Sequence, residues 1–173
     1  MKKYIALLLA VMLVVSMTAC GKKEEAKTPL TDPLEKIVED IYAKHPVEIG
    51  VVTMPVDITD VEWSLYSFTG LKSNENVKEA VASESMIGSI PYSLVLVRVN
   101  EGADALAVAE EMKAGIDQRK WICVEADDLL VSGYCDVIML VMVGSDYASS
   151  GMTAQALTDA FAQVCGAELD FTI

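Results

Sequence analysis

Tyr92 to Val99 reads YSLVLVRV and is the strongest β-strand signal in the chain. Its apolar residues follow one another almost without interruption, which is typical of a strand in the centre of a sheet. Asn100-Glu101-Gly102 then predicts a turn, and the next residues predict a helix over 103–119. We expect the rest of the fold to assemble around this strand and helix.

The same order of elements occurs twice after residue 80. A weak strand over 81–88 precedes the Tyr92–Val99 strand and its helix, and two apolar runs, Leu129–Tyr134 and Val137–Val143, precede a helix over 153–165. Two strand–strand–helix units pack most simply as an antiparallel sheet of about four strands with helices on one face. The expected fold class is therefore α+β, with a further helix before the sheet.

That N-terminal helix is predicted over 33–44. Its apolar face consists of residues at helical spacing: Leu34, Ile37, Val38 and Ile41. Asp32 is placed to cap the first turn, and Pro46 stops the helix. Residues 47–70 predict mostly loop, in which 47–52 could form a short strand. Residues 74–80 predict a brief helix, and 168–173 could add an edge strand.

The first twenty residues predict export. Lys2 and Lys3 precede an apolar run from Tyr4 to Met17, and small residues follow before Cys20. This arrangement is typical of a secretory signal peptide, and the apolar run is shorter than the roughly 20 residues that a membrane-spanning helix needs. The sequence thus divides into a signal peptide over 1–19, a lipidated cysteine with a flexible charged tether over 20–31, and a single α+β domain over 32–173.

The end of the signal, Met17-Thr18-Ala19-Cys20, resembles a bacterial lipobox. The resemblance implies cleavage before Cys20 and acyl chains such as palmitate on that cysteine. These chains would anchor the protein in the cell membrane on its extracytoplasmic face. Two alternatives remain open at this point: an ordinary signal peptide cut near Ala19, and an uncleaved anchor helix.

The charge of the chain excludes one class of partner. The net charge is −13, and loss of Lys2 and Lys3 with the signal takes it to −15. So acidic a protein is repelled by nucleic acid and by anionic lipid headgroups, so we exclude nucleic-acid binding. An envelope protein or a small ligand remains as a partner, besides the membrane that the anchor contacts.

Motifs for catalysis or cofactor binding are absent from the sequence, and no cofactor is expected. His45 is the single histidine, and its place beside Pro46 predicts a helix-capping role better than a catalytic one. Cys123, Cys135 and Cys165 lack the spacing of a zinc site, although a Cys123–Cys135 disulfide is one alternative to three thiols.

One acidic segment could bind a cation weakly. Glu125, Asp127 and Asp128 bring three carboxylates together in four residues. They lack the alternating ligands and glycine of a calcium loop, and solvated turns explain such clusters equally simply. We predict no specific metal site.

Two loops, 53–70 and 145–151, are the expected places for partner binding, because loops carry most binding residues. Trp63, Tyr66 and Phe68 lie in the first of them. These aromatic residues could form an exposed patch or contribute to the core.

The order of these parts is similar to that of a family of lipoproteins from Gram-positive anaerobes, catalogued only as a domain of unknown function. The similarity covers roughly 34–164. It includes Leu34-Glu35-Lys36-Ile37, the strand over 93–99 that leads into the 101–119 helix with Gln118, and the 129–143 hairpin. The resemblance implies no catalytic residues.

The leading hypothesis for function is a lipid-anchored extracytoplasmic binding or interaction module without catalysis. The alternative is a small envelope-acting enzyme, or an accessory subunit of one, with a site near Cys123 or Glu125. A solute-binding lipoprotein of a transporter is disfavoured, because such proteins have two lobes and are much longer than 154 residues, the length that remains of 173 after removal of 1–19.

Overall fold

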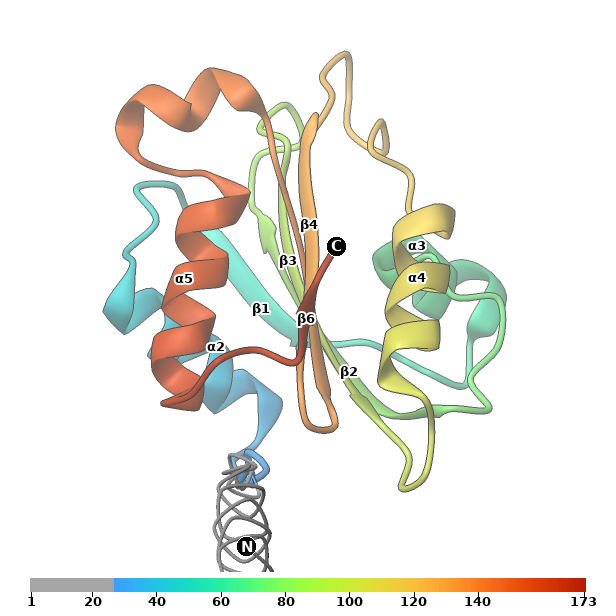
Figure 1. The fold of residues 1–173 in the computed structure, drawn as a ribbon. Helices are drawn as coiled ribbons and strands as arrows, with labels where there is room; N and C mark the ends of the chain where they lie inside the picture. The colour runs from blue at the N-terminus through green and yellow to red at the C-terminus, as the bar shows by residue number, and fades with distance from the viewer. Residues whose placement is uncertain (1–26) are drawn as a thin grey trace, which may run out of the picture.

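The computed structural model describes residues 27–173 as one α+β domain (Figure 1). The predicted signal peptide 1–19, the lipidation site Cys20 and the first part of the tether lie outside the described residues. The α+β class is confirmed.

A six-stranded antiparallel sheet forms the centre of the domain, in the order β1-β2-β3-β5-β4-β6. The strands are β1 Val51–Pro55, β2 Val77–Ser85, β3 Tyr92–Val99, β4 Asp128–Tyr134, β5 Val137–Val143 and β6 Phe171–Thr172. Every residue of β3 and of β5 is buried, so the prediction of a central YSLVLVRV strand is confirmed.

The prediction of about four strands is wrong, because two short strands extend the sheet at its edges. β1 pairs with β2, and β6 pairs with β4 at Gly133. The two strand–strand–helix units are therefore incomplete as a description of the order, since one strand precedes them and another follows. The helix predicted over 74–80 is wrong as well, because β2 already begins at Val77.

The helices are α2 Leu34–Lys44, α3 Tyr66–Thr69, α4 Ala105–Gly115 and α5 Ala154–Cys165, with a π-helical turn, η1, at Val61–Leu65 and a 3-10 turn, η2, at Ser145–Ser150. The apolar stripe predicted for α2 is buried as expected. Asp32 does not cap α2, because its first turn has no side-chain cap.

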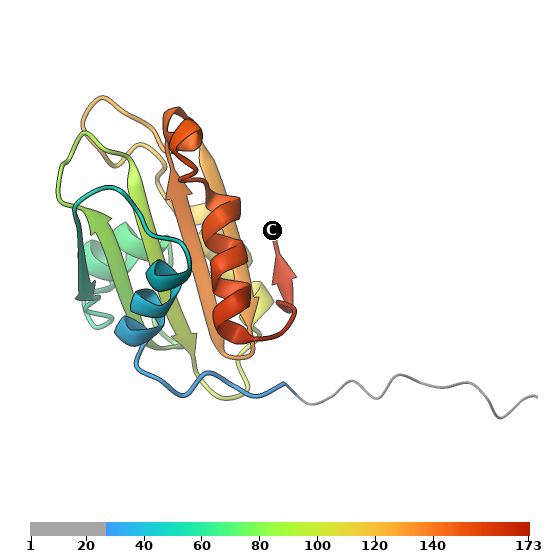
Figure 2. The same cartoon turned by 90° about the vertical axis from the view of Figure 1, so that its left-hand side faces the viewer.

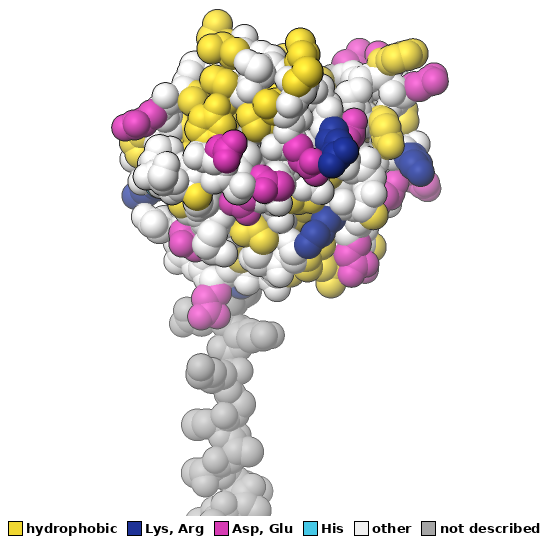
Figure 3. Space-filling model, turned by 90° about the horizontal axis from the view of Figure 1, so that it is seen from above, with side chains coloured by type: hydrophobic (Ala, Val, Ile, Leu, Met, Phe, Trp, Pro, Cys, Tyr) yellow, Lys and Arg dark blue, Asp and Glu magenta, His cyan; other side chains and the backbone are white. Residues whose placement is uncertain are grey.

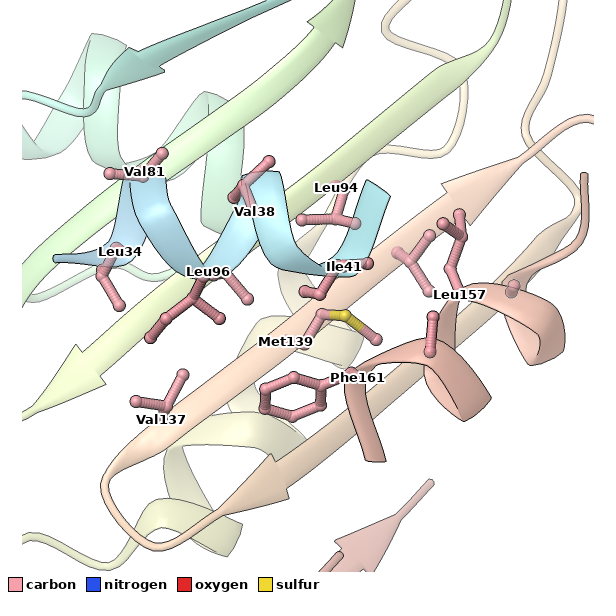
Figure 4. Close-up of a cluster of buried hydrophobic side chains, with 14 of the residues drawn as sticks. Leu34, Val38, Ile41, Val81, Leu94, Leu96, Val137, Met139, Leu157 and Phe161 are labelled. Atoms are coloured by element: carbon pink, nitrogen blue, oxygen red, sulfur yellow. The ribbon is translucent and has the colours of Figure 1, made fainter. Parts of the chain in front are cut away.

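Helices cover both faces of the sheet, which corrects the prediction of helices on one face (Figures 1 and 2). α2 and α5 pack on one face, and α3 and α4 pack on the other. On the first face, α2 and α5 interleave with side chains of the central strands, as Figure 4 shows for Ile41, Leu94, Met139 and Phe161.

The handedness of chain crossovers explains this difference. α4 connects β3 to β4 and α5 connects β5 to β6; each pair is parallel, and each crossover passes one intervening strand. Both crossovers step across the sheet towards β6. The strands β3 and β4, however, run in the direction opposite to that of β5 and β6. Because such crossovers are right-handed, the two helices must lie on opposite faces.

The sheet has two ends that differ in what they carry. We call the end near residues 27–33, with the 135–136 turn, the proximal end. The opposite end carries the loops 45–50, 86–91, 116–127 and 144–153, and we call it the distal end. These loops lie at the top in Figure 1, and the described chain begins at the bottom.

Candidate functional site

At the distal end, large apolar side chains are exposed. Met86 and Ile87 in the β2–β3 loop are 71% and 54% exposed, and Ile122 in the α4–β4 loop is 72% exposed. The two loops are joined, because the Ile122 amide donates a hydrogen bond to the Gly88 carbonyl at 3.0 Å. We call these three residues the distal apolar patch. Figure 3 shows hydrophobic side chains gathered on this end, with acidic side chains beside them.

A hollow of about 450 Å³ adjoins the patch through Cys123, the neighbour of Ile122. Its lining comes from three distal loops: Ser89, Pro91, Cys123, Val124, Glu125, Asp127, Gly144, Ser145, Asp146 and Tyr147. The charged residues in this lining are Glu125, Asp127 and Asp146, all acidic. The hollow is thus an acidic depression beside an apolar surface.

Asp127 holds one wall of the hollow in place. Its carboxylate accepts hydrogen bonds from the Ser145 amide and the Ser145 hydroxyl, both at 2.7 Å. These bonds favour the charged form and lower the pKa of Asp127 from its ordinary value of 3.8. Asp127 therefore joins the 116–127 loop to the start of η2.

The three carboxylates of the predicted cation segment point to different partners. Asp127 binds Ser145, Asp128 accepts a hydrogen bond from the Ala154 amide at the start of α5, and Glu125 forms a 2.7 Å ion pair with Arg119. In the part of the chain that the structure describes, no three Asp, Glu, His or Cys residues are arranged to hold a metal ion. Cation binding at this segment stays a prediction without structural support.

Beneath the distal loops, a largely buried ion pair holds the 116–127 loop on the sheet. Lys120 Nζ lies 2.7 Å from Glu84 Oε1, and the Ser93 hydroxyl donates to the same oxygen at 2.6 Å. The side chains of Lys120 and Glu84 are only 17% and 15% exposed. Lys120 also lies over the rings of Phe68 and Trp121. These contacts fix the base of the loop that carries Ile122.

The same strand ends carry a different network on the other face. Ser83 and Tyr92 neighbour Glu84 and Ser93 in sequence, so the alternation of side chains along a strand directs them to the α2 face. There the Tyr42 hydroxyl donates to Ser83 at 2.7 Å and lies 2.9 Å from the Tyr92 hydroxyl. Burial raises the pKa of Tyr92 well above its ordinary value, so this network stays neutral.

At the proximal end, Arg98 binds the segment that leads into α2. Its guanidinium donates to the carbonyls of Leu30 and Asp32 and pairs with Glu79 at 2.7 Å. Arg98 is only 6% exposed. The guanidinium therefore joins the incoming chain to β2 and β3.

Lys27 makes a second proximal contact. Its ammonium lies 2.6 Å from Asp170 Oδ1 and donates to the Glu168 carbonyl at 2.7 Å. Lys27, which lies inside the segment predicted as tether, thus contacts the domain.

The other residues singled out in the sequence lie apart from one another. His45 ends α2, as predicted, and its ring nitrogen lies 3.1 Å from the Gly151 carbonyl. Trp63 is 75% exposed on η1, whereas Phe68 packs partly against the core. The aromatic segment is therefore neither entirely an exposed patch nor entirely part of the core.

The thiols of Cys123, Cys135 and Cys165 are free. Cys123 lies at the distal end and Cys135 in the proximal turn, with the length of β4 between them. A disulfide needs Cα atoms within roughly 7 Å, so the Cys123–Cys135 alternative does not fit this fold.

Sequence reasoning missed the apolar patch and the Lys120–Glu84 pair. Met86 and Ile87 fell inside the strand predicted over 81–88, but β2 ends at Ser85 and leaves them in the loop. Ile122 is a single apolar residue in a loop, which carries no signal of its own. Lys120 and Glu84 are 36 residues apart and meet only in the fold. Glu125, by contrast, was singled out and does line the hollow.

Searches against protein-family models, curated proteins and solved structures found no match to this chain. Within residues 27–173, no helix has the length and apolar character needed to cross a membrane.

Proposed function

We propose that this chain is a binding module, anchored by lipid at Cys20 on the extracytoplasmic face of the cell membrane, that presents its distal end to a partner protein. The observation that carries the proposal is the position of the distal apolar patch. Met86, Ile87 and Ile122 are exposed at the end of the sheet opposite to Arg98, which binds the incoming chain. Exposed apolar side chains that cluster in this way mark interaction sites.

The length of the tether supports the orientation. Six residues lie between Cys20 and Lys27, so the chain from one to the other extends to roughly 25 Å at most. Lys27 and Leu30 are bound to the domain, so these six residues alone separate it from the anchor. An anchor at Cys20 would hold the proximal end near the headgroups and leave the distal end pointing away from them.

The test has two parts, of which the first concerns the anchor. The wild-type chain and the Cys20→Ala chain are expressed in a Gram-positive host, and cells are fractionated with a phase-separating detergent. We expect the wild type in the detergent phase and the variant outside it. Equal partition of both chains would contradict the anchor.

The second part locates the partner surface. A photo-cross-linking amino acid is placed at Ile122 or, as a control, at Glu110, which is exposed on α4. Irradiation of intact cells should give a discrete adduct from position 122 and none from position 110. No adduct at 122, or equal adducts at both positions, would contradict the distal site.

Cys123 is the residue that favours the enzyme alternative, because it is exposed in the lining of the hollow and has a φ of 62°. A non-glycine residue held in this conformation is sometimes part of a functional site. If Cys123 is a nucleophile, iodoacetamide should alkylate it rapidly even at pH 6. Slow alkylation at pH 6 would contradict this alternative.

A further inference from the structure

The chemistry of the distal end indicates what kind of partner it fits. Among the described residues that line the hollow beside Ile122, the charged ones are all acidic: Glu125, Asp127 and Asp146. The hydrogen bonds from Ser145 lower the pKa of Asp127, so this carboxylate is ionised at neutral pH. A positively charged group in the hollow would therefore lie beside three carboxylates, of which only Glu125 is paired with a cation among the described residues.

The cation that pairs with a carboxylate of the hollow is itself exposed to solvent. Arg119 pairs with Glu125 at 2.7 Å, but its side chain is 76% exposed. Such surface pairs contribute little free energy, so a positively charged group from a partner could replace Arg119 at small cost. Lys120, whose side chain is largely buried beneath the distal loops, is already paired with Glu84.

The apolar patch adds a second requirement. Met86 and Ile122 stand more than two-thirds exposed, and Cys123 connects Ile122 directly to the acidic hollow. A ligand that covers both surfaces needs apolar side chains next to positive ones. The patch protrudes instead of forming an enclosed pocket, which suits a segment of protein better than a small molecule.

The net charge of the whole chain also favours a positively charged partner. Its net charge is −13, so approach of a basic partner is accelerated and approach of an acidic surface is opposed. Charge complementarity thus excludes an anionic lipid headgroup as the occupant of the distal end.

We propose that the distal end binds a basic, apolar protein segment, whose aliphatic side chains cover Met86 and Ile122 while its lysine or arginine side chains enter the hollow beside Glu125 and Asp146. This inference rests on the proposed function and specifies the partner of the same site.

The test uses the full chain in neutral phosphatidylcholine nanodiscs, with empty nanodiscs as background. The probe is a fluorescein-labelled twelve-residue peptide of alternating leucine and lysine. Two comparison peptides replace leucine by serine, or lysine by glutamate. Binding is followed by fluorescence anisotropy. We expect the leucine–lysine peptide to bind at least about tenfold more tightly than either comparison peptide, because each of them lacks one of the two interactions.

Two double variants with equal net charge locate the charge contribution. Glu125→Gln/Asp146→Asn removes two carboxylates from the hollow, and Glu39→Gln/Glu110→Gln removes two exposed carboxylates from α2 and α4. We expect about fivefold weaker binding from the first and less than about twofold from the second. Equal weakening by both would overturn the proposal, because it would show attraction to net charge alone.

A third variant tests the apolar contribution. Met86→Ser/Ile122→Ser changes exposed side chains and is expected to fold normally, which thermal unfolding checks. We expect about tenfold weaker binding of the leucine–lysine peptide. Unchanged binding would overturn the role of the patch.

The outcome of these titrations is separate from that of the cross-linking experiment. Failure of all three peptides to bind would overturn the inferred partner chemistry. A discrete cellular adduct at position 122 would even then support the proposed function, and its absence would contradict that function whichever peptide binds.

Discussion

The two ends of the sheet differ in how their side chains are used and covered. At the proximal end, Arg98 and Lys27 bind backbone carbonyls and carboxylates of the incoming and outgoing chain. At the distal end, Ile122 and Met86 remain exposed, although Lys120 fixes the loop beneath Ile122. The difference indicates that the proximal end serves to hold the chain together. The distal end retains uncovered surface at the expense of burial, which is the expectation for a binding site.

The largest contrast is expected in thiol reactivity. Burial raises the pKa of Cys165 to about 12, whereas Cys123 is exposed at the distal end. At pH 8 only about one Cys165 thiol in ten thousand is then ionised, so iodoacetamide should modify Cys123 at least about a hundredfold faster. Mass-spectrometric mapping of a time course measures both rates.

A Cys123→Ser chain is the control, since it should lose the fast reaction at position 123 and leave the slow reaction at Cys165 unchanged. Rapid modification of Cys165 in the native chain would show that the proximal end is as open as the distal end. Urea should make all three thiols react at similar rates.

The two arginines provide the next comparison. Arg98→Ala removes hydrogen bonds to Leu30 and Asp32 and the packed stem of a nearly buried side chain, and we expect a loss of about 3 kcal/mol in the free energy of unfolding. Arg119→Ala at the distal end removes an exposed pair and should cost far less. Urea unfolding measures both changes. Equal losses would remove the distinction between the ends.

Lys120→Met tests what holds the distal loops. The change keeps most of the packing against Phe68 and Trp121 but leaves the Glu84 carboxylate without its cation, so we expect a loss of about 2 kcal/mol. Adding Glu84→Gln should recover part of that loss, because the unpaired charge is then removed. A double variant less stable than Lys120→Met alone would contradict this account. Urea unfolding of the wild type and of both variants measures these changes.

The smallest effect is expected in the contribution of Asp170 to stability, which is lost at acidic pH. Burial by itself would raise the pKa of Asp170, but hydrogen bonds from Lys27 and from the Cys135 amide outweigh it and lower that pKa below 3.8. A carboxylate with a lowered pKa in the folded state stabilises the fold above its unfolded pKa. Its contribution disappears as the pH falls from about 4 through the lowered pKa.

We therefore expect Asp170→Asn to cost less than about 1 kcal/mol at pH 7 and almost nothing at pH 2, in urea unfolding series at both pH values. An equal cost at both pH values would indicate that the effect of the substitution is not electrostatic. Lys27→Met should give a similar dependence on pH, since it removes the same ion pair.

Much of the fold could be predicted from the sequence. The apolar runs of β3 and β5 and the helical spacing of α2 and α5 gave bounds close to those observed, because these elements bury continuous apolar surface. Whether β1 and β6 form could not be decided from the sequence, because edge strands are short and half exposed, which weakens any periodic pattern. The start of β2 was missed because Lys78 and Glu79 are exposed next to a register shift after Val77.

The proposed binding surface was predictable only in part. Glu125 and Asp127 drew attention as an acidic segment, and both line the hollow. The chemistry then suggested was cation binding, whereas in the structure Asp127 binds Ser145. Carboxylates close in sequence do not converge when the chain between them is extended, as it is where β4 begins at Asp128.

By itself, the sequence determined the elements whose stability is local or strongly apolar: the α2 helix, the β3 and β5 strands, the β4–β5 hairpin and the α+β class. Only the tertiary structure decided that α4 and α5 lie on opposite faces, that Lys120 meets Glu84, and that Met86 and Ile122 share one exposed end. The physical reason is that periodicity reports which residues are buried. It does not report which strands pair, and strand pairing fixes where distant residues meet.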